Sequence, residues 1–581
     1  MSDDQGYGDL SCTGNPILKT PQIDRLAAEG IRFTNFHVDT YCTPTRAALL
    51  TGHYSYRAGG WGTASGRNML RDGETTMAEV FRHNGYRTGI FGKWHLGANY
   101  PYRPMDRGFD EWLGHGNGGT GCASDWWGND RVNDRYLRNG KWEDQPRPGF
   151  EGDVFFDAAM QFIRENKERP FFVYLAPYNP HDPWAISEKA WAEPYSGKVP
   201  KSIADFYASI ARVDWNVGRI REFLANEGLA ENTIFIFLTD NGSSGPRHAG
   251  KAKLFNAGMR GSKGDTYDGG HRVPGFFHWP AGGYKPAEVS RLAAHVDLLP
   301  TLVDLCKLTL PKPVDFDGRS LKPLLANPRE EGWPDRTLVV CEPRNGGGPA
   351  PAKIDIGFSA ILTDRWRLVN GKELHDIVND PGQQRNLAAE NPGVVQQLVA
   401  TYDAYREDVT VETKGWQGRP VIGTASQLET ELLGEDLTTR GGGVPLFQGS
   451  VATGAAAAGH WPVRFAEAGI YQVEIRRWPR ELDAAMTGVP VNGKVPDAWL
   501  DGERVRGTLY RGKPKALPIA KVRLKAGDDV QECGVKEADK FVSFAIKVDE
   551  GVAEIEAAFL DASGKAIGSP YYVFIRKGNE G

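Results

Sequence analysis

TIFIFLTDNG, residues 233–242, is an apolar run that ends in an aspartate, an asparagine and a glycine. Such a run predicts a strand buried on both faces. The preceding segment, from residue 204 on, carries apolar residues at steps of three and four, which predicts a helix with one buried face and with Gly228 as its C-cap: Ile210, Val213, Val217, Ile220 and Leu224. A helix leading into a buried strand is typical of a βαβ unit. Asp240 and Asn241 then follow the strand's carboxyl end, where open α/β sheets bind ligands.

The same alternation of apolar runs and amphipathic stretches extends to about residue 335, with RPFFVYLAP (169–177) as another buried strand. It predicts an α/β domain over 1–335, with a mainly parallel sheet flanked by helices. Short strands and one helix over 336–412 predict a small α+β subdomain packed on it. From 413 to 581 the strands alternate apolar and polar residues between Gly, Pro and Asp, which predicts a β-sandwich. A chain of 581 residues is too long for one core, in agreement with several domains.

Composition excludes several classes of protein. The net charge of -5 and the absence of a long Lys/Arg run argue against a nucleic-acid partner. No run of eighteen or more apolar residues exists, so the sequence predicts no membrane span. The six cysteines show no CxxC spacing, which argues against a zinc cluster or a dense disulfide framework and leaves room for one disulfide.

The stretch CTPTR, residues 42–46, has the features of a helix start. Pro44 suits the first turn of a helix, because its missing N–H would be unpaired there, and Thr43 can cap. Cys42 then lies at the positive end of the helix, and Arg46 adds a fixed charge one turn later, so the pair suits an anion. From local spacing alone, a buried cysteine in a turn is the commoner explanation.

CTPTRAALLTG (42–52) resembles the signature of the type I, formylglycine-dependent sulfatases, which are arylsulfatase-like members of the alkaline phosphatase superfamily. Further segments resemble that family in the expected order, and together they cover about residues 1 to 410. They are GYRTGIFGKWHLG (85–97), FFVYLAPYNPHDP (171–183), TIFIFLTDNG (233–242), MRGSKGDTYDGGHRVP (259–274), HVDLLPTLVDL (295–305), DGRSLKPLL (317–325) and LHDIVNDPGQQRNL (374–387). The resemblance implies an alkaline-phosphatase-like α/β fold.

The resemblance also implies a catalytic set. Cys42 would be oxidised to formylglycine by a maturation enzyme. One hydroxyl of the hydrated aldehyde would displace the alcohol from sulfur, and loss of a proton from the other would expel sulfate. His95 would help remove that proton, Lys93 and Arg46 would hold the hydrate and the sulfate oxygens, and His181 or Lys263 would protonate the leaving oxygen. The i, i+2 spacing of Lys93 and His95 places both on one face if the segment is extended.

A metal site is implied as well. Asp3, Asp4, Asp240 and Asn241 supply oxygen ligands from two separate places in the chain, as a hard cation requires. By resemblance these positions hold Ca²⁺, which binds a sulfate oxygen. Without the resemblance, DNG at 240–242 would be taken for a turn, and Asp3 and Asp4 for part of a solvated terminus.

The activity implied is that of a sulfuric ester hydrolase, acting on a sulfated carbohydrate with aryl sulfates as surrogate substrates. Two alternatives stay open. A phosphonate monoester or phosphodiester hydrolase would share the fold and the nucleophile motif, although GKWHLG and PHDP favour sulfate. A catalytically silent protein that binds sulfated glycans would result if Cys42 were never converted.

Two positions depart from the family pattern. Family members carry an apolar strand, and often an export signal, directly before the aspartate pair, whereas Met1 stands two residues before Asp3. We therefore expect the central strand of the sheet to be missing. The location would be periplasmic or secreted if the true amino terminus carries a signal, and cytoplasmic if the chain is complete as written. Asp268 replaces a usual glutamate, with a modest local effect expected.

Two regions have several possible uses. Residues 119–145 are rich in Trp, Asp, Asn and Arg, and form either a surface excursion or a substrate-binding segment in which Trp126 and Trp127 stack on a ring. The β-sandwich could bind glycans, mediate dimerisation or cover the catalytic domain, because a fold of this kind does not specify a function.

Overall fold

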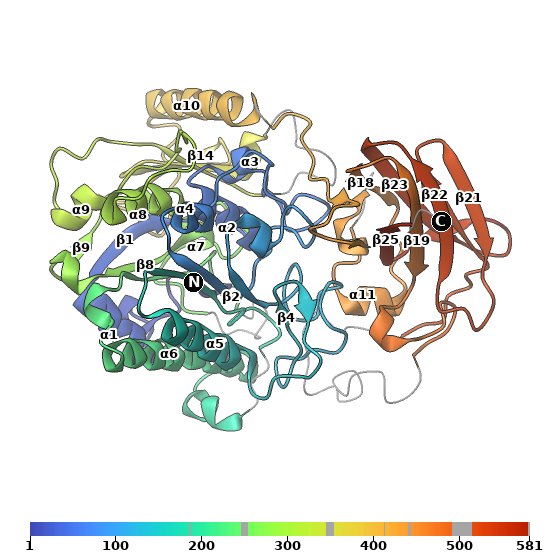
Figure 1. The fold of residues 1–581 in the computed structure, drawn as a ribbon. Helices are drawn as coiled ribbons and strands as arrows, with labels where there is room; N and C mark the ends of the chain where they lie inside the picture. Colours follow the sequence, from blue (N-terminus) through green and yellow to red (C-terminus); the bar gives the residue numbers. More distant parts are fainter. Residues whose placement is uncertain are drawn as a thin grey trace.

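Two mixed sheets form the centre of the larger part of the protein (Figure 1). The computed structural model describes residues 1–184, 188–245, 254–343, 354–411, 413–439, 443–490 and 514–578. One sheet has the order β5 (Lys141–Trp142), β4 (Leu137–Arg138), β3 (Glu111–Gly114), β2 (Arg87–Gly92), β6 (Phe171–Ala176). The other runs β10 (Ala293–Ala294), β1 (Ile31–His37), β8 (Arg272–His278), β7 (Phe235–Leu238), with β9 (Ala287–Val289) also on β1.

Parallel and antiparallel pairs are combined in both sheets. Strand β2 lies parallel to β3 and β6, and β1 lies parallel to β9 and β10. Strand β8 runs antiparallel to both β1 and β7. Helices cover the sheets on both faces, so the predicted α/β class is confirmed.

Residues 1–3 join the two sheets. The Met1 amino group donates to Leu175 O at 2.8 Å, and the Ser2 N–H donates to Leu238 O at 3.1 Å. Ser2 also pairs in parallel with Thr239. A cavity of about 780 Å³ lies between β6 and β7 and is lined by residues of both strands and by Met1. Burial, with the nearby charge of Arg46, lowers the pKa of the Met1 amino group to about 5.

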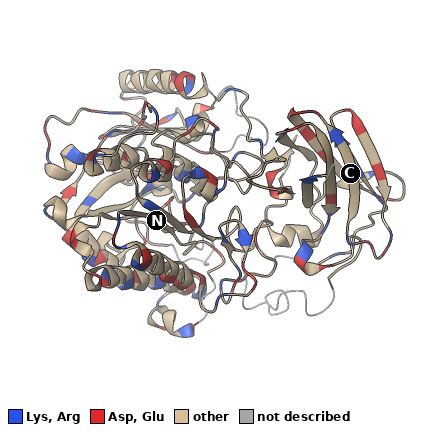
Figure 2. Ribbon diagram, viewed as in Figure 1, with Lys and Arg blue, Asp and Glu red and all other residues tan. Residues whose placement is uncertain are grey.

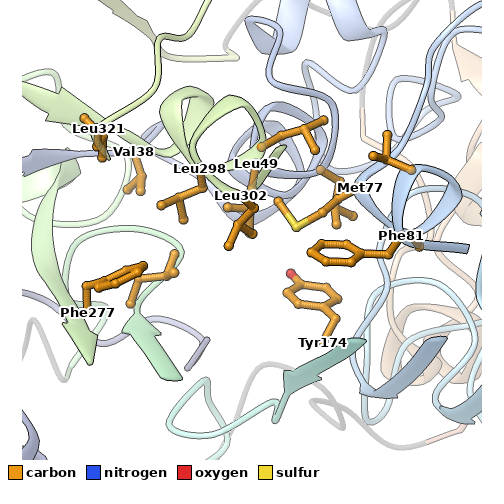
Figure 3. Close-up of a cluster of buried hydrophobic side chains, with 14 of the residues drawn as sticks. Val38, Leu49, Met77, Phe81, Tyr174, Phe277, Leu298, Leu302 and Leu321 are labelled. Carbon is orange, nitrogen blue, oxygen red and sulfur yellow. The ribbon is translucent and has the colours of Figure 1, made fainter. Parts of the chain in front are cut away.

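One hydrophobic cluster packs helices against the upper face of the sheets in Figure 1, and Figure 3 shows part of it. It contains apolar residues of α2 (Cys42–Thr51), α4 (Met77–His83) and α8 (Leu298–Cys306), including Leu49, Phe81 and Leu302. These helices contact residues of the strands such as Tyr174 and Phe277. The catalytic candidate Cys42 therefore begins a helix that is held by the main core.

A second cluster packs α1 (Pro21–Glu29), α5 (Glu151–Asn166) and α6 (Lys201–Asn226) on the opposite face (Figure 1). The predicted apolar face of α6 is buried: Ile210, Val213, Val217, Ile220 and Leu224. Gly228, at φ +72°, follows the helix end. Strand β7 then delivers Asp240 and Asn241 beyond its carboxyl end, as the sequence predicts.

The region after the larger sheets begins with an antiparallel meander. Its strands are β11 (Leu338–Cys341), β12 (Ser359–Leu362), β13 (Trp366–Val369) and β14 (Glu373–Asp376). Helix α10 (Pro392–Val411) packs on this sheet through residues such as Leu398 and Tyr402. The elements agree with an α+β subdomain, while the limits 1–335, 336–412 and 413–581 stay a prediction.

Two further sheets pack face to face around one apolar cluster and form a β-sandwich, at the right in Figure 1. The first has the order β15 (Val421–Ile422), β18 (Gly459–Phe465), β23 (Gly551–Leu560), β20 (Lys521–Ala526), β21 (Asp529–Gly534), with β17 (Thr438–Thr439) and β24 (Ala566–Gly568) at its side. The second runs β16 (Glu429–Leu433), β25 (Tyr572–Lys577), β19 (Gly469–Arg476), β22 (Val542–Val548). We call residues 413–578 the accessory β-sandwich.

Charged residues of both signs are interspersed along the helices and strands of both parts of the molecule (Figure 2). Among the described residues, no helix is both long and apolar enough to cross a membrane. The six cysteines are all free thiols in the structure, so the optional disulfide is not formed.

Candidate active site

Cys42 is the first residue of helix α2 and is 3% exposed. The preceding residue, Tyr41, is extended, so the chain turns sharply into the helix at Cys42. Pro44 occupies the first turn, as predicted, and Gly52 at φ +71° ends the helix. The Cys42 side chain therefore lies at the end of α2 where unpaired N–H groups and the helix dipole favour an anion.

His95 lies directly beside Cys42. Its Nδ1 is 3.3 Å from Cys42 Sγ, and its Nε2 is 3.0 Å from Thr63 O. A carbonyl only accepts, so Nε2 carries the proton and Nδ1 directs a lone pair at Cys42. Burial, together with the positive charges of Lys93 and Arg46, lowers the pKa of His95 well below its usual value. His95 is thus a neutral base.

The segment that carries Lys93 and His95 is not an extended strand. His95 adopts φ +64° in a loop after β2, so the i, i+2 argument from strand geometry was wrong. From this left-handed turn the His95 side chain reaches Cys42, while Lys93 reaches Asp3. A backbone conformation of this kind in a non-glycine residue is uncommon and is often found at functional sites.

Cationic and acidic side chains converge next to this pair. Lys93 Nζ lies 2.6 Å from Asp3 Oδ2, and Arg46 Nη2 lies 2.9 Å from Asp240 Oδ2. Although burial opposes it, the Asp3 carboxylate raises the pKa of Lys93, which stays charged. Burial and the charge of Asp3 raise the pKa of Asp240 to about 6. The site is therefore an alternating set of buried opposite charges.

His181 and Lys263 meet at Asp4. Lys263 Nζ is 2.5 Å from Asp4 Oδ1, and His181 Nε2 is 3.5 Å from Asp4 Oδ2. Burial acts to raise the pKa of Asp4, but His181 and Lys263 outweigh it and hold that pKa far below its usual range. In return Asp4 raises the pKa of His181 against the effect of burial. These two cations are the least buried of the set, with side chains 13% exposed.

The oxygen atoms of the acidic group fit a hard cation. Asp3 Oδ1, Asp4 Oδ2 and Asn241 Oδ1 are buried and have no hydrogen-bond partner in the part of the chain that the structure describes. Asn241 Nδ2 donates to Asp4 Oδ1 at 2.9 Å, which ties the two segments together. Carboxylate and amide oxygens are the ligands that Ca²⁺ prefers. Asp240 Oδ1 accepts from the Asp4 N–H at 2.9 Å.

A second group with the composition of a metal site is His37, Asp268 and His271. Here Arg367 Nε lies 2.9 Å from Asp268 Oδ1 and its Nη2 lies 3.3 Å from His37 Nε2. A guanidinium at that place already supplies the positive charge, so these residues do not fit a cation. Asp268 instead joins the larger sheets to β13.

The structure brings all the predicted site residues into one connected network: Asp3, Asp4, Cys42, Arg46, Lys93, His95, His181, Asp240, Asn241 and Lys263. The network draws on six separate parts of the chain. Sequence distance between them gave no sign of this proximity. Only the resemblance of the separate motifs to one family indicated that these residues lie together.

Sequence reasoning missed residues that hold this network. The ring of Tyr178 stacks on His181 with centroids 4.5 Å apart, and Lys93 Nζ lies 4.8 Å from the centre of the same ring. Arg131 Nη2 donates to His181 O at 2.7 Å. Tyr178 stands within the motif FFVYLAPYNPHDP, which was the available signal. For Arg131 no local pattern pointed to the site.

The two tryptophans singled out in the sequence have different surroundings. Trp127 is 7% exposed and packs edge to face on Trp478 of the accessory β-sandwich, with centroids 5.5 Å apart. It is a domain contact and not a free stacking platform. Trp126 is half-buried between Trp142 and the guanidinium of Arg135.

Comparison with known proteins gives one consistent result. The sulfatase family model matches residues 1–308. Arylsulfatase A of Homo sapiens is 35% identical over 446 residues, which span 68% of this chain and 85% of that protein. N-acetylgalactosamine-6-sulfatase of Homo sapiens is 32% identical over 355 residues, 57% of this chain and 65% of that protein.

Comparison with a solved structure shows that the fold is similar as well. The crystal structure of Ps i-CgsB in complex with k-i-k-neocarrahexaose matches with a TM-score of 0.62 and 26% identity, over 72% of this chain and 94% of that one. Since the family model covers more than half of the chain and the fold and site agree with it, the protein belongs to the sulfatase family and is an enzyme that hydrolyses sulfate esters.

Proposed function

We propose that this sulfatase releases sulfate from a sulfated carbohydrate, with a formylglycine made from Cys42 as nucleophile and Ca²⁺ held by Asp3, Asp4, Asp240 and Asn241. The observation that carries the proposal is the pair of Cys42 and a neutral His95, 3.3 Å apart at the start of α2, inside a ring of buried cations. A maturation enzyme that converts Cys42 is then a required partner.

The first role belongs to the start of α2. Converted to formylglycine, Cys42 would supply a hydrated aldehyde whose one hydroxyl attacks sulfur and whose other hydroxyl permits release of sulfate. The helix end and Arg46 stabilise negative charge at this position. His95 Nδ1, with its lone pair directed at Cys42, is placed to accept the proton.

The charged side chains bind the sulfate and complete the proton transfer. Lys93 and Lys263 each stay protonated because of a neighbouring carboxylate, so they supply fixed positive charge to the sulfate oxygens. His181, whose pKa Asp4 raises, holds a proton that can pass to the leaving oxygen. It is also more exposed than His95, on the side where the substrate's alcohol part must lie.

The metal would be held by the oxygens of the acidic group. Bound there, Ca²⁺ would neutralise the carboxylates and attract a sulfate oxygen. The lysines now paired with Asp3 and Asp4 would then be released toward the substrate. The support for this assignment is the set of three buried oxygens without a hydrogen-bond partner among the described residues, on Asp3, Asp4 and Asn241.

The carbohydrate part of the proposal rests on relatives. The name of the human relative specifies an N-acetylgalactosamine sulfate, and the solved neighbour is described in complex with a neocarrahexaose. Both substrates are sugars. The half-buried Trp126 beside Arg135 would suit a substrate that has both ring faces and anionic groups.

The test combines a mass and a rate. The peptide with Cys42 is expected to be about 18 Da lighter than its unmodified mass, the change from thiol to aldehyde, and the same preparation should release sulfate from an aryl sulfate. The matched phosphate ester should react far more slowly. Cys42→Ala should abolish turnover. Substantial activity of that variant, or an unmodified thiol in active enzyme, would contradict the proposal.

A further inference from the structure

A glycine-rich loop, GHGNGGTGC at 114–122, forms a wall beside the catalytic residues. A side-chain carbon at Gly118 would lie 3.6 Å from His95 Nε2, and one at Gly119 would lie 2.5 Å from the ring of Tyr178. Gly119 also has φ +125°. At position 119 the loop therefore packs its backbone on the Tyr178 ring at a distance that only glycine permits, and at position 118 it lies in ordinary van der Waals range of His95.

One glutamine of the accessory β-sandwich holds this loop and its continuation. Gln448 begins helix α11 (Gln448–Thr453) and is fully buried. Its Nε2 lies 3.2 Å from Cys122 O, 3.1 Å from Asp125 O and 3.2 Å from Trp126 O. Its Oε1 accepts from the Gly128 N–H at 3.1 Å. A single side chain thus bridges four backbone groups of a segment that has no regular secondary structure, with its two N–H donors shared among three carbonyls.

Backbone contacts reinforce the same junction. The Gln448 N–H donates to Gly121 O at 3.0 Å, and the Ala123 N–H donates to Leu446 O at 2.9 Å. The hydroxyl of Tyr572, on β25, donates to Ala123 O at 3.1 Å. The loop is therefore fixed from the accessory β-sandwich at several successive residues.

A second loop beside His95 is held from the same side. Thr63 O bonds to His95 Nε2, and two residues later the Ser65 N–H donates to Glu435 O at 2.9 Å. Glu435 lies in the turn Gly434–Asp436 of the accessory β-sandwich. Both segments that contact the outer nitrogen of His95 thus depend on one neighbouring domain.

We infer that Gln448 is a positioning residue for the active site, and that the accessory β-sandwich is an integral part of the catalytic unit and not a separate binding module. The inference rests on the proposed function, since it assumes that His95 acts on Cys42. Removal of the Gln448 amide would take its bond from Asp125 O and its acceptor from the Gly128 N–H, whereas Cys122 O and Trp126 O keep the N–H groups of Asp125 and Asn129. The 114–128 segment would therefore move to find other partners.

The experiment compares two glutamines of the accessory β-sandwich. Gln448→Met keeps the length of the side chain and removes its hydrogen bonds. Gln427→Met is the matched control, because Gln427 Nε2 donates to Asn99 Oδ1 at 2.8 Å and its Oε1 accepts from the Tyr100 N–H at 2.7 Å. It joins the same two parts of the protein, away from the 114–128 segment.

Full-length variants are assayed on an aryl sulfate after mass spectrometry has established equal formylglycine content. Gln448→Met is expected to lower kcat about ten-fold with KM little changed, because a catalytic group displaced by less than 1 Å costs that much or more. Gln427→Met should keep kcat within about two-fold of the wild type. Thermal melting of both variants measures the structural cost separately.

A second pair of variants, with smaller changes, tests the inference if Gln448→Met does not fold. Tyr572→Phe removes one bond to the loop and should lower kcat about two-fold to three-fold, while Tyr471→Phe, which removes a hydroxyl bonded only within the sandwich to Glu467 O, should not. Equal kcat for each variant and its control would overturn the inference. A wild-type enzyme with full formylglycine and no turnover would instead contradict the proposed function.

Discussion

At the scale of single residues, the chemistry of this site depends on two histidines that differ in charge. His95 is a buried imidazole and His181 a half-buried one, both near lysines, yet their pKa values move in opposite directions. Burial and two cations keep His95 neutral, whereas Asp4 keeps His181 charged. One histidine is therefore suited to accept a proton and the other to donate one, which is the arrangement that general acid–base catalysis requires.

The donor role of His181 can be tested with leaving groups. His181→Ala should lower kcat/KM for an alkyl or sugar sulfate about 100-fold or more, and for an aryl sulfate with a good leaving group by only about ten-fold or less, because a phenoxide needs little protonation. Steady-state rates on both substrates measure the difference. Equal losses on the two substrates would argue against His181 as the acid.

The acidic group should also respond to metal. Adding Ca²⁺ to metal-free protein is expected to raise the melting temperature, since a ligand that binds only the folded state stabilises it. Asn241→Ala removes one of the buried oxygens without a partner and should reduce that rise, while Asn232→Ala, on the far side of β7, should leave it intact. An unchanged calcium response in Asn241→Ala would exclude Asn241 as a ligand.

At the scale of elements, the pattern of apolar residues predicted those helices and strands whose formation depends on nearby residues in the sequence. Helix α6 and strand β7 have clear periods of apolar residues, and both formed where expected. The start of α2 followed from Pro44, but Thr43 does not cap it, because Thr43 lies within the helix and its hydroxyl donates to His95 O at 3.3 Å. By contrast, the φ +64° turn at His95 depends on contacts with Thr63 and Cys42 from distant segments, so no local signal could reveal it.

The burial of α2 gives a stability prediction. Leu50 is fully buried and packs with α4 and α8 in the main cluster. Leu50→Ala should reduce the free energy of unfolding by about 2–5 kcal/mol, from lost transfer energy and the cavity left behind. Leu428→Ala, at a residue 78% exposed, should change it by less than about 0.5 kcal/mol. Chemical denaturation measures both values, and similar values for the two would contradict the packing described.

At the scale of the whole molecule, the sequence predicted a β-sandwich but not its use. The three alternatives were glycan binding, dimerisation and cover for the catalytic domain. Gln448, Tyr572 and Glu435 each contact a loop of the larger domain, and none of them stands in a motif. Contacts between domains arise from the shapes of two finished surfaces, which a single sequence without an alignment does not reveal.

The junction of the two parts should weaken as pH rises. Burial and the neighbouring Asp436 raise the pKa of Glu435 from 4.5 to about 8, so the folded protein holds a proton that the unfolded chain releases. Stability from this group is complete below about pH 4.5 and is lost as pH rises toward 8. Glu435→Gln, which cannot ionise, should therefore melt like the wild type at pH 5 and higher than the wild type at pH 8.

Calorimetry at the two pH values provides that measurement. Glu467→Gln is a control for the loss of one carboxylate, since Glu467 lies on the outside of the sandwich in a surface ion pair with Lys577. It should show no comparable gain at pH 8. A Glu435→Gln protein that melts below the wild type at pH 8 would contradict the raised pKa.

The cavity of about 780 Å³ between β6 and β7 also has a mechanical consequence. Hydrostatic pressure favours states of smaller volume, and internal voids that disappear on opening supply most of that volume change. Among the described residues at this place, residues 1–3 link the two sheets, so the sheets should part under compression while the accessory β-sandwich stays folded. Under pressure, hydrogen exchange at the amide of Ile236 should accelerate well before exchange at Val473. The centre of this enzyme, and not its periphery, would then be its most compressible region.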